Sequence, residues 1–555
     1  MVSSSAPQST VILCDSLEKV FAEGAPRALD GSIPVIGYHG ERASFQVAIY
    51  TERRAHFDNL RYAKISISAP YGVNSRVRAV DAVPVSLPAP PEAGMQYLRT
   101  APGLYPDLLR PLADSEPFSL LTDRWQAAWI DLEISEHATV GESTVQVMVS
   151  IDDETSTHEL PFRVVGHTLP PLDIVNTHWF HSDGLIDYYA LEPFSEEFWE
   201  VHKNFLQSAA DMTVNSVLTP VWTPPLDTAE GGTRTPTQLL RIRDNGDGDY
   251  CFDPEHLRRW LALCRDAGMR YLEMPHLFTQ WGARATPAIY VDSPVGTQRR
   301  FGWDVPATDP SYRELLEQML PYLFAFLEDE WGLDRIFFHI SDEPTEEHLE
   351  SYSAAKAVVD DLLADVTVVD AISSHEFFQR GLVALPVVAT NHARTFLDRE
   401  VEPMWLYYCV AQSHGVANRF IAMSSAHNRV LGNQLYLSGA AGFLHWGFNF
   451  YNAQLSTRAI NPFLDTSSGG GFYGGDAFMV YPGPGGEPMT SIRYEVFREA
   501  MLDHRAARLL EHRVGTAATR RILSSDSFDE LGVSPDLHPD EIRRIALRVA
   551  DALSN

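Results

Sequence analysis

Short runs in the first third of the chain alternate apolar with polar residues and are separated by turn-forming residues. The clearest runs are 45–50, 63–67, 128–134 and 145–149. A period of two is typical of strands with one buried face, and its repetition at this spacing predicts an antiparallel β-sandwich. Because Pro170 and Pro171 suit a linker, we expect this N-terminal sandwich to span residues 1–168.

From residue 172 the pattern changes to short apolar strands that alternate with longer segments of helical period. The expected strands are 176–180, 215–221, 271–275, 336–340, 366–370, 387–390, 404–408 and 442–446. The expected helices are 196–212, 254–267, 311–331, 345–363, 377–381, 417–438 and 493–511. Eight strands in such an order predict an α/β fold with a (β/α)8 TIM-like barrel over residues 169–511.

The last segment, residues 512–555, is charged and regains a helical period in its second half. Ile542, Ile545, Val549 and Leu553 share one helical face. We therefore expect a C-terminal helical extension to which no chemistry is assigned.

The fourth expected strand carries the most informative motif. The run 336–340 is apolar apart from His339, and Ser341, Asp342, Glu343 and Pro344 follow it directly. In a barrel the carboxyl ends of the strands form the catalytic rim, so two carboxyl groups here favour an active site. The alternative is structural, since Ser341 or Asp342 could cap the helix that follows.

Composition and charge narrow the class of partner. Hydrophobic residues make up 45% of the chain and charged residues 21%, with a net charge of −31. A surface this acidic repels phosphate backbones and anionic lipids, so we expect neither nucleic acid nor membrane as a partner. The first fifteen residues lack the pattern of a signal peptide, and a cytoplasmic location is expected. The four cysteines form no CxxC pair, which argues against a disulfide framework.

Aromatic residues at the expected strand ends favour a carbohydrate substrate, because the apolar faces of sugar rings stack on aromatic side chains. The cluster is Trp179, Trp222, Trp281, Trp405, Tyr407, Tyr408, Trp446 and Phe448, of which about half are expected only to pack. We expect Trp179, Trp222, Tyr407 and Trp446 to bind the substrate.

A glycine-rich loop and several histidines raise two further possibilities. The loop 467–476 is followed by no helix and lacks the Lys-Ser/Thr ending of a phosphate loop, so we expect a rim loop that brings Asp476 to the ligand. The histidines show no metal-binding spacing. We therefore expect no metal or cofactor, and His339 is expected to bind the sugar.

Three motifs resemble the catalytic domain of glycoside hydrolase family 123, once catalogued as DUF4091. They are the segments 339–344, 442–449 and 476–484, the last followed by Ser491, Ile492 and Arg493. Residues 40–46 and 169–170 are similar to the N-terminal module of that family. The resemblance implies a β-sandwich before a (β/α)8 barrel, and an exo-acting, retaining β-N-acetylgalactosaminidase that uses substrate assistance. By the same resemblance Glu343 is the general acid/base and Asp342 orients the 2-acetamido group.

The spacing of the two carboxyl groups agrees with that mechanism. An ordinary retaining glycosidase needs a nucleophile about 5 Å from its acid, on the other side of the sugar. Successive residues do not flank a sugar easily, but they can serve a substrate whose own acetamide attacks. Two alternatives stay open: a glycosidase of another sugar or mechanism that draws a nucleophile or base from Glu273 or Asp370, and a non-catalytic carbohydrate-binding barrel.

Overall fold

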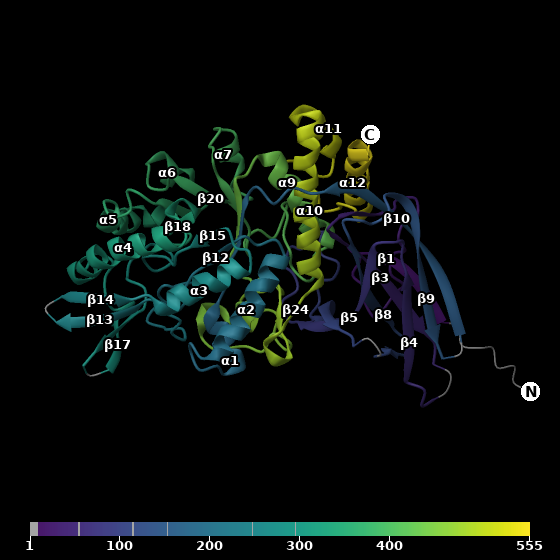
Figure 1. Ribbon diagram of the computed structural model, residues 1–555, viewed down its shortest axis with the longest axis horizontal. Coiled ribbons are helices and arrows are strands. Elements are labelled where there is room, and N and C mark those ends of the chain that lie inside the picture. The colour runs from purple at the N-terminus through teal and green to yellow at the C-terminus, as the bar shows by residue number, and fades with distance from the viewer. Residues whose placement is uncertain are drawn as a thin grey trace, which may run out of the picture. The chain divides into compact units, whose positions relative to one another are not determined.

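The computed structural model describes residues 9–53, 56–113, 116–152, 154–246, 248–294 and 296–554 (Figure 1). Its contacts group the chain into two compact units. One contains Met1–Asp173, Ala417–Leu437 and Met489–Asn555, and the other contains Ile174–Val416 and Ser438–Pro488. The domain boundaries after residues 168 and 511 stay a prediction.

Two five-stranded sheets form the first unit. One has the order β1 (Ser9–Asp15), β3 (Arg42–Thr51), β8 (Trp125–Ile134), β5 (Val73–Val85) and β6 (Gly103–Pro111). The other has the order β2 (Val35–His39), β10 (Glu154–Thr168), β9 (Gly141–Ile151), β4 (Leu60–Ser68) and β7 (Phe118–Leu121). All neighbours are antiparallel except β2 and β10. Phe45 and Ile130 of one sheet and Val147 and Phe162 of the other share a buried core, which confirms the antiparallel sheets expected at the N-terminus.

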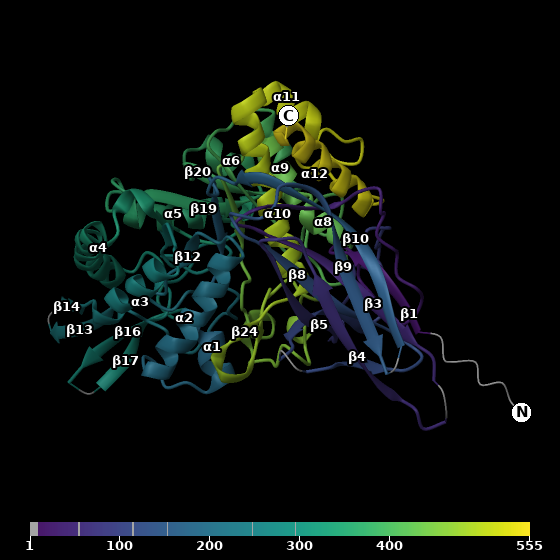
Figure 2. The same ribbon diagram turned by 45° about the vertical axis from the view of Figure 1, so that its right-hand side comes forward.

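Helices complete the first unit. They are α8 (Ser425–Arg429), α9 (Leu431–Ser438), α10 (Ile492–Val514), α11 (Thr516–Leu523) and α12 (Pro539–Ser554). Figures 1 and 2 show α10, α11 and α12 side by side. The single helix expected over 417–438 is wrong in its first third, because the buried Lys19 ammonium binds the carbonyls of Phe420 and Met423. The Phe420 carbonyl also accepts from the Met423 N–H at 3.0 Å, an isolated turn that does not continue as a helix.

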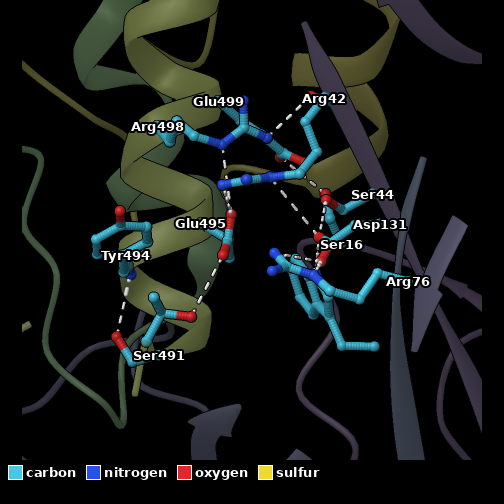
Figure 3. A network of polar contacts seen from close by, with 12 residues as sticks. Ser16, Arg42, Ser44, Arg76, Asp131, Ser491, Tyr494, Glu495, Arg498 and Glu499 are labelled. Carbon is cyan, nitrogen blue, oxygen red and sulfur yellow. Dashed lines mark hydrogen bonds and ion pairs between the residues drawn. The ribbon is translucent and has the colours of Figure 1, made fainter. Parts of the chain in front are cut away.

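A buried ionic network joins α10 to the sheet of β3, β5 and β8 (Figure 3). Glu495 of α10 accepts hydrogen bonds from Arg42 at 2.9 Å and from Arg78 at 2.8 Å. Asp131 accepts from Arg78 at 2.8 Å and from the Trp129 indole at 2.9 Å. The carboxylates of Asp131 and Glu495 are fully buried, so each depends on these partners for its charge.

The second unit is built on a closed barrel of eight parallel strands, which confirms the eight expected. They are β11 (Val175–His178), β12 (Ser216–Leu218), β15 (Tyr271–Glu273), β18 (Ile336–Phe338), β19 (Thr367–Ile372), β20 (Leu385–Ala389), β21 (Trp405–Tyr407) and β22 (Gly442–His445). The barrel closes where β11 pairs with β22. Phe337 and Trp405 meet edge to face inside it, with ring centroids 4.7 Å apart. Gly442 is needed here, because a Cβ would lie 2.6 Å from the Trp405 ring.

Helices and turns of uneven length connect the barrel strands. The helices are α1 (Ser182–Tyr189), α2 (Glu196–Asp211), α3 (Glu255–Asp266), α4 (Pro310–Glu330), α5 (Leu349–Val359), α6 (His375–Gln379) and α7 (Arg394–Leu397). Single turns of 3-10 helix are η1 (Leu333–Arg335), η2 (Glu346–His348), η3 (Gln454–Ser456), η4 (Ser468–Gly470) and η5 (Pro484–Gly486). Two short strands, β23 (Tyr481–Pro482) and β24 (Pro488–Met489), lie on either side of η5 in the sequence. No helix among the described residues is long and apolar enough to cross a membrane.

One additional sheet of the second unit was not expected from the sequence. Its order is β14 (Asp249–Asp253), β13 (Arg241–Gly246), β16 (Ile289–Ser293) and β17 (Gly296–Phe301). β14 lies beside α4, as Figures 1 and 2 show. Because its strands are rich in charged and exposed residues, they lack the apolar alternation by which the other strands were found.

Candidate active site

Asp342 and Glu343 lie in the loop after β18, where the chain leaves the barrel. The Ser341 hydroxyl donates to the Thr279 carbonyl at 2.8 Å, and the backbone N–H of Trp281 donates to the backbone carbonyl of Asp342 at 3.0 Å. Glu343 has φ = 45°, a left-handed conformation that costs free energy for a residue with a side chain. Strain of this kind is concentrated at functional sites, because the surrounding structure must hold it in place.

The helix-cap interpretation of this motif is wrong. The turn η2 begins after Thr345, whose side chain and backbone form a reciprocal capping box with His348. Neither Ser341 nor Asp342 caps η2 or α5. The two carboxyl groups therefore have no role in starting the helix.

Both carboxyl groups line a cavity of about 210 Å³ at the carboxyl ends of the strands. Its lining is Trp179, Leu226, Asp227, Gln280, Trp281, Asp342, Glu343, Ala371, Tyr407, Cys409, Val410, Leu444, Trp446, Gln454 and Phe472. Five aromatic rings and several aliphatic side chains form the walls, and a few polar groups lie among them. Such a lining offers the apolar faces and the hydrogen-bond partners that a sugar ring requires.

A larger and more polar cavity of about 720 Å³ adjoins the first. Trp281 and Glu343 line both cavities, whereas Asp342 lines only the smaller one. The rest of its lining is Pro344, Thr345, Glu346, Ser373, Ser374, His375, Glu376, Gln379, His392 and Arg399. Glu343 thus stands at the junction of the two cavities, and the indole of Trp281, 43% exposed, lies beside it.

Five of the eight residues predicted to form the site meet in the smaller cavity: Trp179, Asp342, Glu343, Tyr407 and Trp446. His339, Trp222 and Asp476 are buried and do not line it. The Trp222 indole donates to the His276 carbonyl at 3.0 Å. Asp476 accepts a hydrogen bond at 3.0 Å from the Trp446 indole, so it holds a wall of the cavity from behind.

The aromatic cluster divides evenly between the cavity and the core. Trp179, Trp281, Tyr407 and Trp446 line the cavity. Trp222, Trp405, Tyr408 and Phe448 are fully buried and pack. The sequence could not separate the two groups, since members of both lie in strands or shortly after them.

Sequence reasoning missed several lining residues, among them Asp227, Gln280, Gln454 and Phe472. Gln280 precedes Trp281, and Phe472 belongs to the glycine-rich loop, so both lay beside residues already considered. Asp227 and Gln454 come from irregular segments without any periodic signal. Burial raises the pKa of Asp227 to about 6, which makes this carboxyl group the most important of the omissions.

The two catalytic candidates have perturbed protonation. Burial raises the pKa of Glu343, and a hydrogen bond of 2.6 Å from the Tyr407 hydroxyl opposes that shift. Burial and then the neighbouring Glu343 charge raise the pKa of Asp342, while the charge of His339 lowers it. Each of two adjacent buried carboxyl groups opposes the ionisation of the other, which favours a state in which the pair shares one proton.

One group of side chains below the site has the composition of a metal centre. His276, His339 and Asp370 offer ligand atoms within 4.8 Å of one another. The two imidazoles are stacked, however, with centroids 4.4 Å apart and planes inclined by 28°. A metal binds a histidine along a lone pair in the plane of the ring, and stacked rings direct these lone pairs alongside one another. The geometry therefore does not fit a shared ion.

Paired carboxyl groups in an aromatic cavity at the rim of a parallel barrel are the arrangement of a glycoside hydrolase. The comparisons agree. The model of the glycoside hydrolase 123 catalytic domain matches residues 179–510. This chain belongs to glycoside hydrolase family 123, and it is a glycosidase that acts on a carbohydrate substrate.

Among solved structures, a family 123 glycoside hydrolase from Clostridium perfringens is similar over 98% of both chains, with 14% identity and a TM-score of 0.72. The endo-β-1,4-mannanase of Thermotoga petrophila is 11% identical over 60% of this chain and 77% of its own, with a TM-score of 0.33. The search of the curated proteins found no match.

Proposed function

We propose that this enzyme is an exo-acting, retaining β-N-acetylgalactosaminidase that works by substrate assistance at the rim of a (β/α)8 barrel. The observation that carries the proposal is that two consecutive carboxyl residues, Asp342 and Glu343, line one cavity. Family membership supports the same choice. The similar Clostridium perfringens enzyme is described as acting on glycolipid glycans, which supports a glycan substrate.

In this mechanism Glu343 arrives protonated and gives its proton to the glycosidic oxygen as the bond to the anomeric carbon breaks. The acetamide oxygen of the substrate attacks the anomeric carbon and forms an oxazolinium ion. Asp342 accepts a hydrogen bond from the acetamide N–H, which favours its ionised form and leaves the shared proton on Glu343. Glu343 then removes a proton from water as the water opens the oxazolinium ion, so the configuration is retained.

The two cavities suggest how the substrate lies. The smaller one has the dimensions for a single sugar ring, which suits exo cleavage. The larger one is lined by Glu343 but not by Asp342, as expected for the side of the leaving group. An acid at the junction can protonate the oxygen that joins the two parts of the substrate.

The alternative nucleophiles considered from the sequence are poorly situated. Glu273 and Asp370 are fully buried inside the barrel, and neither lines either cavity. Glu273 accepts hydrogen bonds from Trp179 and His339, and Asp370 accepts from Tyr352 and the Ile340 N–H. Asp227 is the one other carboxyl group in the lining of the smaller cavity among the described residues.

The test measures the cleavage of three aryl β-glycosides by the wild-type enzyme and by Asp342→Asn. The sugars are N-acetylgalactosamine, N-acetylglucosamine and galactose. We expect cleavage of the N-acetylgalactosaminide and no cleavage of the plain galactoside. Asp342→Asn should lower kcat more than it changes KM, because its interaction is made mainly in the transition state. A thiazoline analogue of the oxazolinium ion should inhibit wild type far better than the variant.

Covalent trapping decides between assistance and double displacement. A 2-fluoro sugar with a good leaving group should leave wild type unlabelled, because the nucleophile belongs to the substrate. A label on Asp227, seen by mass spectrometry of peptides, would contradict the proposal and identify an ordinary nucleophile.

A further inference from the structure

His339 precedes Asp342 by three residues, and its side chain lies between two further carboxylates. Its Nε2 is 3.0 Å from Glu273 Oε2, and its Nδ1 is 3.6 Å from Asp370 Oδ1. All three side chains have no exposed surface. The three residues come from β15, β19 and the end of β18, so one imidazole links three barrel strands.

The buried carboxylates of Glu273 and Asp370 call for a positive charge on His339. Two buried carboxylates without a positive partner would each lose their hydration with nothing in exchange. A doubly protonated imidazole donates to Glu273 through Nε2 and forms an ion pair with Asp370 through Nδ1, whereas a neutral ring offers only the hydrogen bond. Burial opposes the charge of His339, but its contacts with Asp370 and Glu273 outweigh burial and raise its pKa to about 9.

The neighbouring groups are consistent with a single positive charge here. His276 is the ring stacked on His339, and burial together with the His339 charge holds its pKa well below the usual value, so His276 is neutral. Tyr352 donates to Asp370, and Thr177 and Ser216 donate to Glu273. These hydroxyls satisfy the carboxylates but supply no charge.

The same group is connected to the walls of the site. The Ile340 N–H donates to Asp370 at 3.0 Å, which fixes the chain two residues before Asp342. Glu273 also accepts at 3.0 Å from the indole of Trp179, a residue of the smaller cavity. A change at His339 is therefore transmitted both to the loop of Asp342 and to an aromatic wall.

We infer that His339 is a buried imidazolium that positions the loop of Asp342 and, through its charge, favours the ionised form of the Asp342 carboxylate in oxazolinium stabilisation. The inference rests on the role proposed for Asp342. His339 does not touch the sugar, so it is a positioning residue and acts through its charge and through the strand end.

The experiment measures kcat/KM against pH for wild type, His339→Gln and the control His276→Gln. His339→Gln keeps a hydrogen-bond donor for Glu273 but loses the charge. We expect kcat to fall at least 10-fold with a smaller change of KM. The acidic limb of the profile, where Asp342 takes up a proton, should move upward by about 1 to 3 pH units, the usual effect of an adjacent charge. His276→Gln should leave that limb in place, because it removes no charge.

A double variant separates charge from packing. His339→Gln/Asp370→Asn removes one positive and one negative charge together, so the barrel keeps its charge balance even if the single variant folds poorly. We expect the acidic limb to return part of the way to its wild-type position in the double variant, because the Asp370 charge raises the pKa of Asp342 and so opposes His339. An acidic limb shifted as far in the double variant as in His339→Gln, or an unmoved acidic limb in a folded His339→Gln, would overturn the inference.

The charge of His339 can also be tested in the wild-type enzyme. In ¹⁵N-histidine NMR at pH 8 we expect at least one doubly protonated ring, and its absence would also overturn the inference. Failure of the proposed function would look different, since Asp342→Asn would then leave kcat and thiazoline binding unchanged whatever the charge of His339.

Discussion

The hydrogen bond between Tyr407 and Glu343 allows a quantitative test of the proton donor. The Tyr407 hydroxyl lies 2.6 Å from Glu343 Oε1 and stabilises the ionised carboxylate. A hydrogen bond to a charged group is worth about 1.5–3 kcal/mol, and one pKa unit corresponds to about 1.4 kcal/mol. Tyr407→Phe should therefore raise the pKa of Glu343 by about 1 to 2 units, since the neutral acid no longer competes with a stabilised anion.

The assay is kcat/KM against pH with an unactivated N-acetylgalactosaminide. The alkaline limb reports loss of the proton from the general acid, and in Tyr407→Phe it should move to higher pH. Tyr408→Phe is the matched control, because Tyr408 is the next residue but packs against Phe443 and His445. An alkaline limb that stays in place, or moves to lower pH, would refute the assignment of Glu343 as the acid.

Three further predictions follow from the site and the fold. Glu343→Gln should lower the rate about 10²- to 10⁴-fold, with dinitrophenyl leaving groups affected least, as a comparison of two leaving groups by steady-state kinetics would show; equal losses would argue against a proton donor. Asp131→Asn should lower the free energy of unfolding by about 1.5–3 kcal/mol in urea titrations, because the buried Arg78 guanidinium loses one of its two carboxylate partners and keeps only Glu495, whereas Asp81→Asn in the half-exposed pair with Arg110 should cost at most about 1 kcal/mol. Exhaustive treatment with EDTA should leave full activity, and a loss restored by one divalent metal would contradict the stacking argument.

The barrel could be predicted because its strands are buried on both faces and therefore form short apolar runs bounded by polar residues. Asp342 and Glu343 stood out because they interrupt the pattern at a strand end. The charged residues inside the barrel were harder to interpret. His339 belongs to an apolar run, and only the structure brings Glu273 and Asp370 to its two ring nitrogens.

Other features depend on contacts between residues that are distant in the sequence. The break before α8 follows from Lys19, about four hundred positions earlier, and no local pattern reports such a partner. Asp227 reaches the cavity from an irregular loop, where neither period nor capping residues give a signal. Loops are selected for the groups they present, so their patterns carry little information on structure.

The buried ionic network of α10 affects how this protein can be divided. Glu495 and Arg498 lie within the segment that matches the catalytic domain, whereas Arg42, Arg78 and Asp131 lie before it. A gene fragment cut at the edge of the catalytic match would carry the buried Glu495 carboxylate with Arg498 but without its partners Arg42 and Arg78. Recombination between relatives would face the same constraint, because α10 and the strands β3, β5 and β8 must come from compatible parents. The N-terminal sheets and this helix should therefore be inherited together, as one evolutionary unit.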